Sequence, residues 1–117
     1  MLNFFLKFSI TRQVRTKRND NFYLRNLQLC ALIAALEGRL ADAARLIGSV
    51  DAAYGRVDGA RNFWEARSYE RLVALLKGGL SEPDLRASLA EGARWDAEAA
   101  IDFTFEHILR REAGQGA

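Results

Sequence analysis

The chain has 117 residues, of which 50 % are hydrophobic and 27 % are charged. This length allows one domain with a hydrophobic core, and the composition is that of a soluble globular chain. The single cysteine, Cys30, excludes a disulfide within the chain and a metal site built on a cysteine pair. The longest apolar run, at residues 29–36, is far shorter than the roughly 20 residues of a transmembrane helix. We therefore expect a cytoplasmic protein.

The formal charge of +2 is distributed unevenly along the chain. Residues 1–18 contain no acid and carry +5, whereas residues 19–117 carry 12 basic and 15 acidic side chains, a formal charge of −3. The five basic residues are Lys7, Arg12, Arg15, Lys17 and Arg18. This division argues against a folded body that lies along phosphates, and leaves a basic N-terminal arm as the alternative nucleic-acid-binding element.

The chain divides into three parts by pattern. Residues 1–21 are aromatic and then basic without a helical stripe, and we expect a poorly ordered or weakly packed leader, with a surface-lying membrane segment as another alternative. Residues 22–112 form the predicted helical domain. Residues 113–117 have nothing to bury and should form a frayed tail.

Abundant Ala, Leu, Arg and Glu with one proline favour helices, so we predict an all-α fold. The predicted helices cover residues 22–36, 39–54, 60–77, 81 to 90 or 93, and a last segment from 96. Gly38 should end the first helix and Gly78-Gly79 the third, because glycine favours helix C-termini. Ser81 and Asp96 are typical N-caps.

The first helix is apolar around nearly all of its circumference. Leu29 and Ile33 widen its apolar stripe until few polar positions remain, and such a helix must be covered on several sides. We therefore expect it to dock against a preceding helical repeat or to mediate self-association.

Residues 24–57 fit the tetratricopeptide pattern, a helix–turn–helix unit with small residues where its helices touch. Ala31 and Ala43 occupy the small positions, Gly38 the turn and Ile47 a large packing position. The match predicts antiparallel helical hairpins that form a fragment, about five helices long, of a tetratricopeptide-like right-handed superhelix.

The second half of the chain adds to this likeness. Residues 24–106 resemble the C-terminal helical region of large bacterial ATP-binding transcriptional regulators of the LuxR and SARP types, and of relatives that join the ATPase to an adenylate cyclase. The residues that carry the likeness are Gly38-Arg39, Ala43-Ala44-Arg45-Leu46-Ile47-Gly48, Tyr69-Glu70-Arg71, Leu85, Ala90-Glu91-Gly92 and Asp96-Ala97-Glu98-Ala99-Ala100. The resemblance implies a sensory or scaffolding role within transcriptional regulation.

Two parts of such regulators are missing from this sequence. It contains no glycine-rich phosphate loop for an ATPase, and only a short tail follows the last predicted helix, where many relatives carry a DNA-reading module. We therefore expect a shortened product or a detached domain.

No residue pattern indicates catalysis, a cofactor or a metal. His107 is the only histidine and has no carboxylate at the spacing that would pair with it on a helix. Cys30 lies inside an apolar helix with no flanking cation to activate it. We predict that the protein is not an enzyme.

The candidate partner-binding residues are apolar. Phe63, Trp64 and Trp95 stand near predicted helix ends, where large aromatics either line a groove or fill the edge of a core. Leu29 and Ile33 complete the set on the first helix. We expect a non-enzymatic scaffold that binds a protein partner, with a small dimeric nucleic-acid-binding protein as the alternative.

Overall fold

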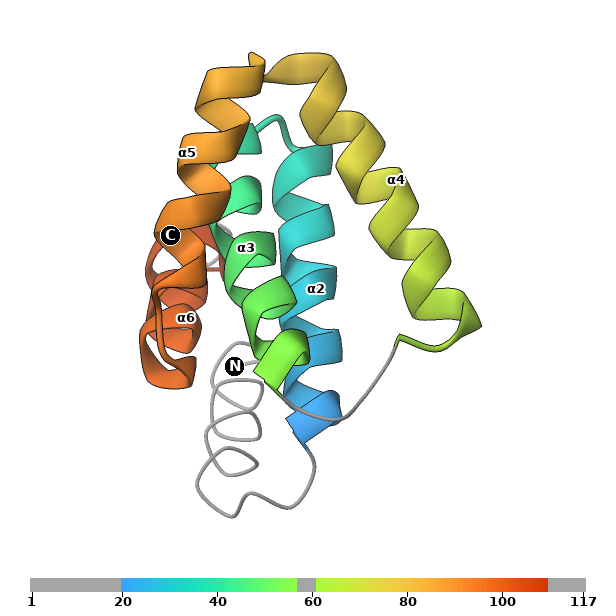
Figure 1. Cartoon of the computed structure of the whole chain (residues 1–117), viewed down its shortest axis with the longest axis vertical. Coiled ribbons are helices and arrows are strands. Elements are labelled where there is room, and N and C mark those ends of the chain that lie inside the picture. The colour runs from blue at the N-terminus through green and yellow to red at the C-terminus, as the bar shows by residue number, and fades with distance from the viewer. Residues whose placement is uncertain (1–19, 57–60, 110–117) are drawn as a thin grey trace, which may run out of the picture.

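In a computed structural model of the chain, the structure describes residues 20–56 and 61–109, and every regular element within them is helical (Figure 1). The elements are α2 (Asp20–Leu36), α3 (Leu40–Arg56), α4 (Phe63–Gly79), α5 (Glu82–Ala93), α6 (Ala97–Phe103) and the π-helical segment η1 (Thr104–Leu109). The predicted all-α fold is confirmed. The superhelical, tetratricopeptide-like arrangement stays a prediction. Almost all of the predicted leader and the whole tail lie outside the described residues.

The α2–α3 hairpin turns at Gly38. This glycine has φ +88°, which is favourable only for a residue without a Cβ. Its N–H donates to the carbonyl of Ala35 at 3.0 Å, and the N–H of Arg39 donates to that of Ala34 at 2.9 Å. These two bonds satisfy carbonyls that the end of α2 would otherwise leave free. The prediction that Gly38 ends the first helix is confirmed, and α2 and α3 run antiparallel side by side (Figure 1).

Helix α3 lies at the centre of the molecule, between α2 and α5 (Figure 1). Its contact with α5 brings the two backbones together at glycines. A Cβ built on Gly92 would overlap the backbone carbonyl of Arg45, and one built on Gly48 would overlap that of Leu89. Because neither glycine has a side chain, α5 packs directly onto the backbone of α3.

Helix α4 is attached to the core over only part of its length. Its two buried residues, Leu72 and Leu76, both lie in its C-terminal half. Helix α4 ends within the predicted Gly78-Gly79 stop, but it runs two residues beyond the predicted end at residue 77, through Gly79, and the chain becomes extended only at Leu80. A helical glycine costs about 1 kcal/mol relative to alanine, and that penalty alone does not end a helix.

Two further helix starts match the local sequence signals. The side chain of Ser81 accepts a hydrogen bond from the N–H of Asp84 at 3.2 Å, and α5 follows. The side chain of Asp96 accepts one from the N–H of Ala99 at 2.8 Å at the start of α6. Both predicted N-caps are confirmed.

The C-terminal elements close one side of the core. Ala100, Ile101 and Ile108 join the buried cluster that α2 and α3 supply. Buried Thr104 donates its hydroxyl to the carbonyl of Ala100 at 2.8 Å. The guanidinium group of Arg39, in the α2–α3 turn, donates to the carbonyl of Ile108 at 3.4 Å and so ties the end of η1 to the first hairpin.

Candidate functional site

The large hydrophobic side chains that remain exposed in the described part of the chain all belong to α2 and the first turn of α4. On α2, Leu29 is 52 %, Ile33 39 % and Leu36 52 % exposed. On α4, Phe63 is 64 % and Trp64 76 % exposed. Single exposed apolar residues are common on protein surfaces, but a group of large ones on two adjacent helices marks a candidate interaction site.

The two helices that carry these side chains line one hollow together. Leu32 of α2 and Arg67, Ser68, Glu70 and Arg71 of α4 line the same hollow, of about 490 Å³. Residues three or four apart stand side by side on the surface of a helix. Leu32 therefore neighbours Leu29 and Leu36 on α2. On α4, Trp64 neighbours Arg67 and Ser68. We call this surface the α2–α4 face. Its members are Leu29, Leu32, Ile33, Leu36, Phe63, Trp64, Arg67 and Arg71.

The face combines aromatic rings with guanidinium groups. The rings of Phe63 and Trp64 meet edge to face, with centroids 5.2 Å apart. The guanidinium group of Arg67 lies 5.7 Å from the ring centroid of Phe63. Within residues 20–56 and 61–109, no carboxylate forms an ion pair with Arg67 or Arg71. The face therefore offers two cations that a partner's carboxylates could contact, beside the carboxylate of Glu70 that lines the same hollow.

The exposed aromatic pair is flanked by residues that are fixed in place. Immediately before it, the guanidinium group of Arg61 lies over the rings of Tyr69, at 4.0 Å, and Tyr54, at 4.5 Å. The same group donates to the side-chain oxygens of Gln28 and Asp51, each at 2.6 Å. Arg61 is therefore bound to α2, α3 and α4 at once.

The residue that follows the pair, Glu65, is held as firmly. Its Oε1 accepts the backbone N–H of Asn62 at 2.8 Å, and the Asn62 side chain accepts the N–H of Glu65, which makes a capping box. Its Oε2 accepts the hydroxyl of Tyr54 at 3.1 Å and pairs with Arg25 at 3.3 Å. The first turn of α4 therefore has a fixed position, although its aromatic side chains project into solvent.

We call these flanking residues the Arg61 cluster. Its members are Arg25, Gln28, Asp51, Tyr54, Arg61, Asn62, Glu65 and Tyr69. Burial and the hydrogen bond to Glu65 raise the pKa of Tyr54 to about 12. Burial and the hydrogen bond to Asp51 also raise the pKa of Tyr69. The raised pKa values extend to higher pH the range in which both phenols stay neutral and donate these hydrogen bonds.

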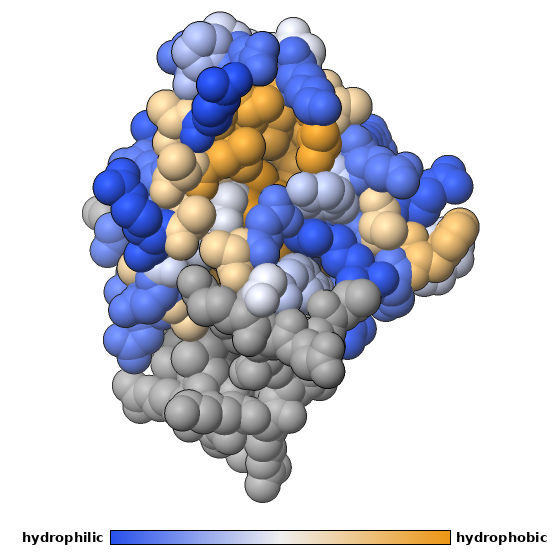
Figure 2. All heavy atoms as spheres, viewed as in Figure 1, coloured by the Kyte–Doolittle hydropathy of each residue, from blue (hydrophilic) through white to orange (hydrophobic). Residues whose placement is uncertain are grey.

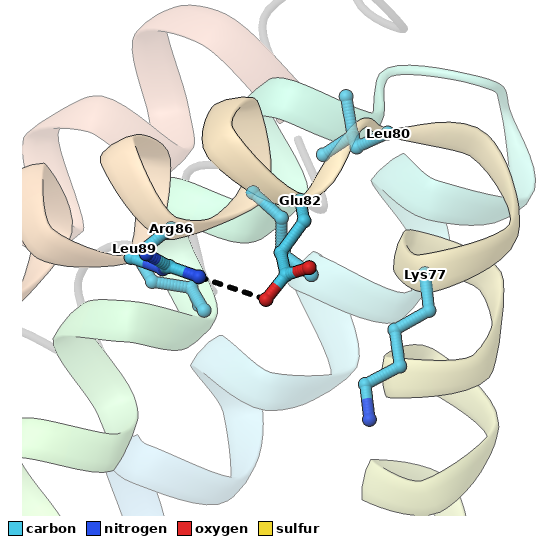
Figure 3. Close-up of a pocket in the computed structure, with 6 residues that line it drawn as sticks. Lys77, Leu80, Glu82, Arg86 and Leu89 are labelled. Atoms are coloured by element: carbon cyan, nitrogen blue, oxygen red, sulfur yellow. Dashed lines mark hydrogen bonds and ion pairs between the residues drawn. The ribbon is translucent and has the colours of Figure 1, made fainter.

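A second hollow, of about 520 Å³, lies between α4 and α5. Leu80, Leu85 and Leu89 form its apolar lining, and all three are half-buried against the core. Figure 2 shows this apolar concavity with hydrophilic side chains around it. Lys77 stands on one side and the ion pair of Glu82 and Arg86 on the other (Figure 3). We call it the α4–α5 groove.

The structure brings together four of the five predicted partner-binding residues. Leu29, Ile33, Phe63 and Trp64 belong to the α2–α4 face. Trp95 does not, because it lies in the α5–α6 connection, on the side of the molecule away from α4 (Figure 1). There it is half-buried, and its ring packs 4.6 Å from that of Phe103. Trp95 thus fills the edge of the core, the alternative role expected for these aromatics.

The remaining sequence-based expectations concern catalysis and nucleic acid. The basic residues of the proposed arm all lie outside the described residues. They are Lys7, Arg12, Arg15, Lys17 and Arg18. In the part of the chain that the structure describes, no cluster of His, Cys, Asp and Glu could hold a metal ion, and no helix is both long and apolar enough to cross a membrane. Cys30 is buried, and exposed His107 stacks on Phe103 at 4.6 Å.

Sequence reasoning missed several members of the α2–α4 face. Leu36 follows Ile33 by three residues and Leu29 by seven, so it lies on the apolar stripe of α2, but it was not among the predicted partner-binding residues. Arg67 and Arg71 follow Phe63 at intervals of four and indicate the same face of α4. The Arg61 cluster left no such signal, because its members come from three helices that only folding brings together.

Comparison with protein-family models, curated proteins and solved structures finds no match to this chain. The resemblance to regulators of the LuxR and SARP types therefore rests on the sequence pattern alone.

Proposed function

We propose that this protein is a non-enzymatic helical scaffold that binds a protein partner through the α2–α4 face. The observation that carries the proposal is the fixed first turn of α4, which presents Phe63 and Trp64 to solvent. Trp and Arg are enriched among the residues that dominate binding energy in protein interfaces. A side chain on an already ordered element loses less conformational entropy on binding than one on a mobile loop.

The apolar stripe of α2 supports the same function. Apolar surface for burial by the partner would come from Leu29, Ile33 and Leu36. Trp64 would act as the anchor residue of the interface. The partner's carboxylates would be selected by Arg67 and Arg71. The resemblance to bacterial transcriptional regulators suggests the kind of partner: a preceding helical repeat of such a regulator, or a protein that takes its place. Self-association through α2 is the variant of this proposal in which the partner is a second copy.

A capture experiment tests the proposal. Tagged whole chain, the double variant Phe63→Ser, Trp64→Ser and the control Glu98→Ser, Asp102→Ser are incubated with extract of the source cells, and bound proteins are quantified by mass spectrometry. Both control positions are exposed on α6. We expect the aromatic variant to lose a partner about ten-fold or more while the control retains it. Equal capture by all three proteins would contradict the proposal.

The basic arm favours a second candidate function, a small dimeric nucleic-acid-binding protein. Residues 1–18 carry +5 with no acid, a distribution suited to phosphate contacts. Binding of this kind predicts an affinity that falls steeply with salt. Replacement of all five basic residues by serine should abolish this dependence of the affinity on salt; they are Lys7, Arg12, Arg15, Lys17 and Arg18. Binding by the wild-type chain that does not change with salt would contradict this function.

A further inference from the structure

We propose that the α4–α5 groove is a second docking site, and that its occupant is an amphipathic helix of a partner protein whose apolar face is flanked by acidic residues. This site is separate from the α2–α4 face. The inference stands on the shape of the groove, its leucine lining and the charges along its edges.

The shape of the groove suits a helix. α4 and α5 meet near their connection and diverge from it (Figure 1), and the leucine-lined hollow beside that connection forms a slot that is open to solvent (Figure 2). The half-buried Leu80, Leu85 and Leu89 pack against the core from below and present apolar surface to the slot. Leucine side chains spaced along one face of a helix would remove that surface from water.

The charge at the edges selects the occupant. Lys77 is exposed at one edge, and no carboxylate in the described part of the chain forms an ion pair with it. At the other edge, Arg86 pairs with Glu82 at 2.8 Å, but these side chains are 76 % and 80 % exposed. The edges therefore carry a formal charge of +1 with one cation unpaired.

This local charge is opposite in sign to that of the surrounding body. The described residues include 10 basic and 13 acidic side chains, a formal charge of −3. An acidic segment is thus attracted to Lys77, and residues 1–18 of this chain, with +5 and no acid, are a poor electrostatic match. These charges favour a partner's acidic helix over the chain's own N-terminal segment.

Two synthetic peptides test the inference by fluorescence polarisation. The first is a labelled amphipathic helix with leucines along one face and glutamates beside them, and the second carries lysines in place of the glutamates. We expect the wild-type chain to bind the glutamate peptide about three-fold more tightly, the effect of one exposed ion pair. Lys77→Glu should reverse that preference, while Arg94→Glu, the same charge change at an exposed position outside the groove lining, should preserve it.

Three further outcomes separate this site from others. Leu85→Gln, checked for folding by circular dichroism, should weaken both peptides, whereas Phe63→Ser, Trp64→Ser should leave both unchanged. Failure of the wild-type chain to bind either peptide would overturn the docking site. A preference that Lys77→Glu leaves intact would overturn the role of charge. Loss of binding in the Phe63, Trp64 variant would move the peptide to the α2–α4 face and also contradict the inference.

Discussion

Arg61 holds the N-terminal end of α4 against α2 and α3. The N-terminal half of α4 contributes no buried residue, so polar contacts hold this half in place. The C-terminal half is held instead by its buried leucines. The Arg61 side chain is only 17 % exposed and is bound to Gln28, Asp51 and two tyrosine rings. Charged hydrogen bonds that are mostly shielded from water contribute more than exposed ones.

Replacement of Arg61 by methionine should therefore destabilise the fold. The variant keeps an unbranched side chain of similar length but leaves the partially buried Gln28 and Asp51 oxygens without their donor, and we expect a loss of about 1–3 kcal/mol in the free energy of unfolding. Urea denaturation measures this loss. Arg71→Met, at an exposed position, should change stability by less than about 0.5 kcal/mol, and equal effects of the two substitutions would contradict the role of Arg61.

The tyrosines of the same cluster predict a loss of stability in alkali. Folding raises the pKa of Tyr54 from 10.0 to about 12, so the folded state favours the neutral phenol. This contribution is fully present below pH 10 and is lost as the pH rises through about 12. Denaturation midpoints measured across this range should fall for the wild type. They should fall less steeply for Tyr54→Phe, which has no phenol to ionise at this position.

At the scale of elements, the contact between α3 and α5 depends on two glycines. Gly92→Ala would place a methyl group on the backbone carbonyl of Arg45 and force the helices apart, at a cost of about 1–3 kcal/mol. Gly78→Ala is the matched control: it lies in α4 with open space around it, and should stabilise the helix by up to about 1 kcal/mol. Thermal unfolding should show shifts of opposite sign, and shifts of the same sign would contradict the packing.

The helices were largely predictable from local signals, but their partners were not. Gly38, Ser81 and Asp96 act on their own helix ends through backbone hydrogen bonds, and their roles follow from the adjacent sequence. Gly48 approaches the backbone of Leu89, and Gly92 approaches that of Arg45, but nothing in the sequence around either glycine indicates these contacts. The tertiary contact, and not the propensity of glycine, explains their presence inside helices.

At the scale of the whole molecule, the structure has two apolar surfaces separated by α4. The first is the α2–α4 face, and the second is the α4–α5 groove. The sequence indicated part of the first, because an apolar stripe around α2 has more members than one neighbour can cover. It did not distinguish Trp64 from Trp95, since both stand at helix starts and only the direction in which each helix leaves the core decides which ring is exposed.

Photo-crosslinking tests whether a protein partner binds on the α2–α4 face. A photoreactive phenylalanine analogue is placed at position 33, at position 64, or at the exposed position 99 of α6, and each whole chain is irradiated in extract of the source cells. We expect an adduct with the same protein from positions 33 and 64, and little from position 99. Adducts from 33 and 64 that are no more abundant than those from 99 would contradict binding at this face.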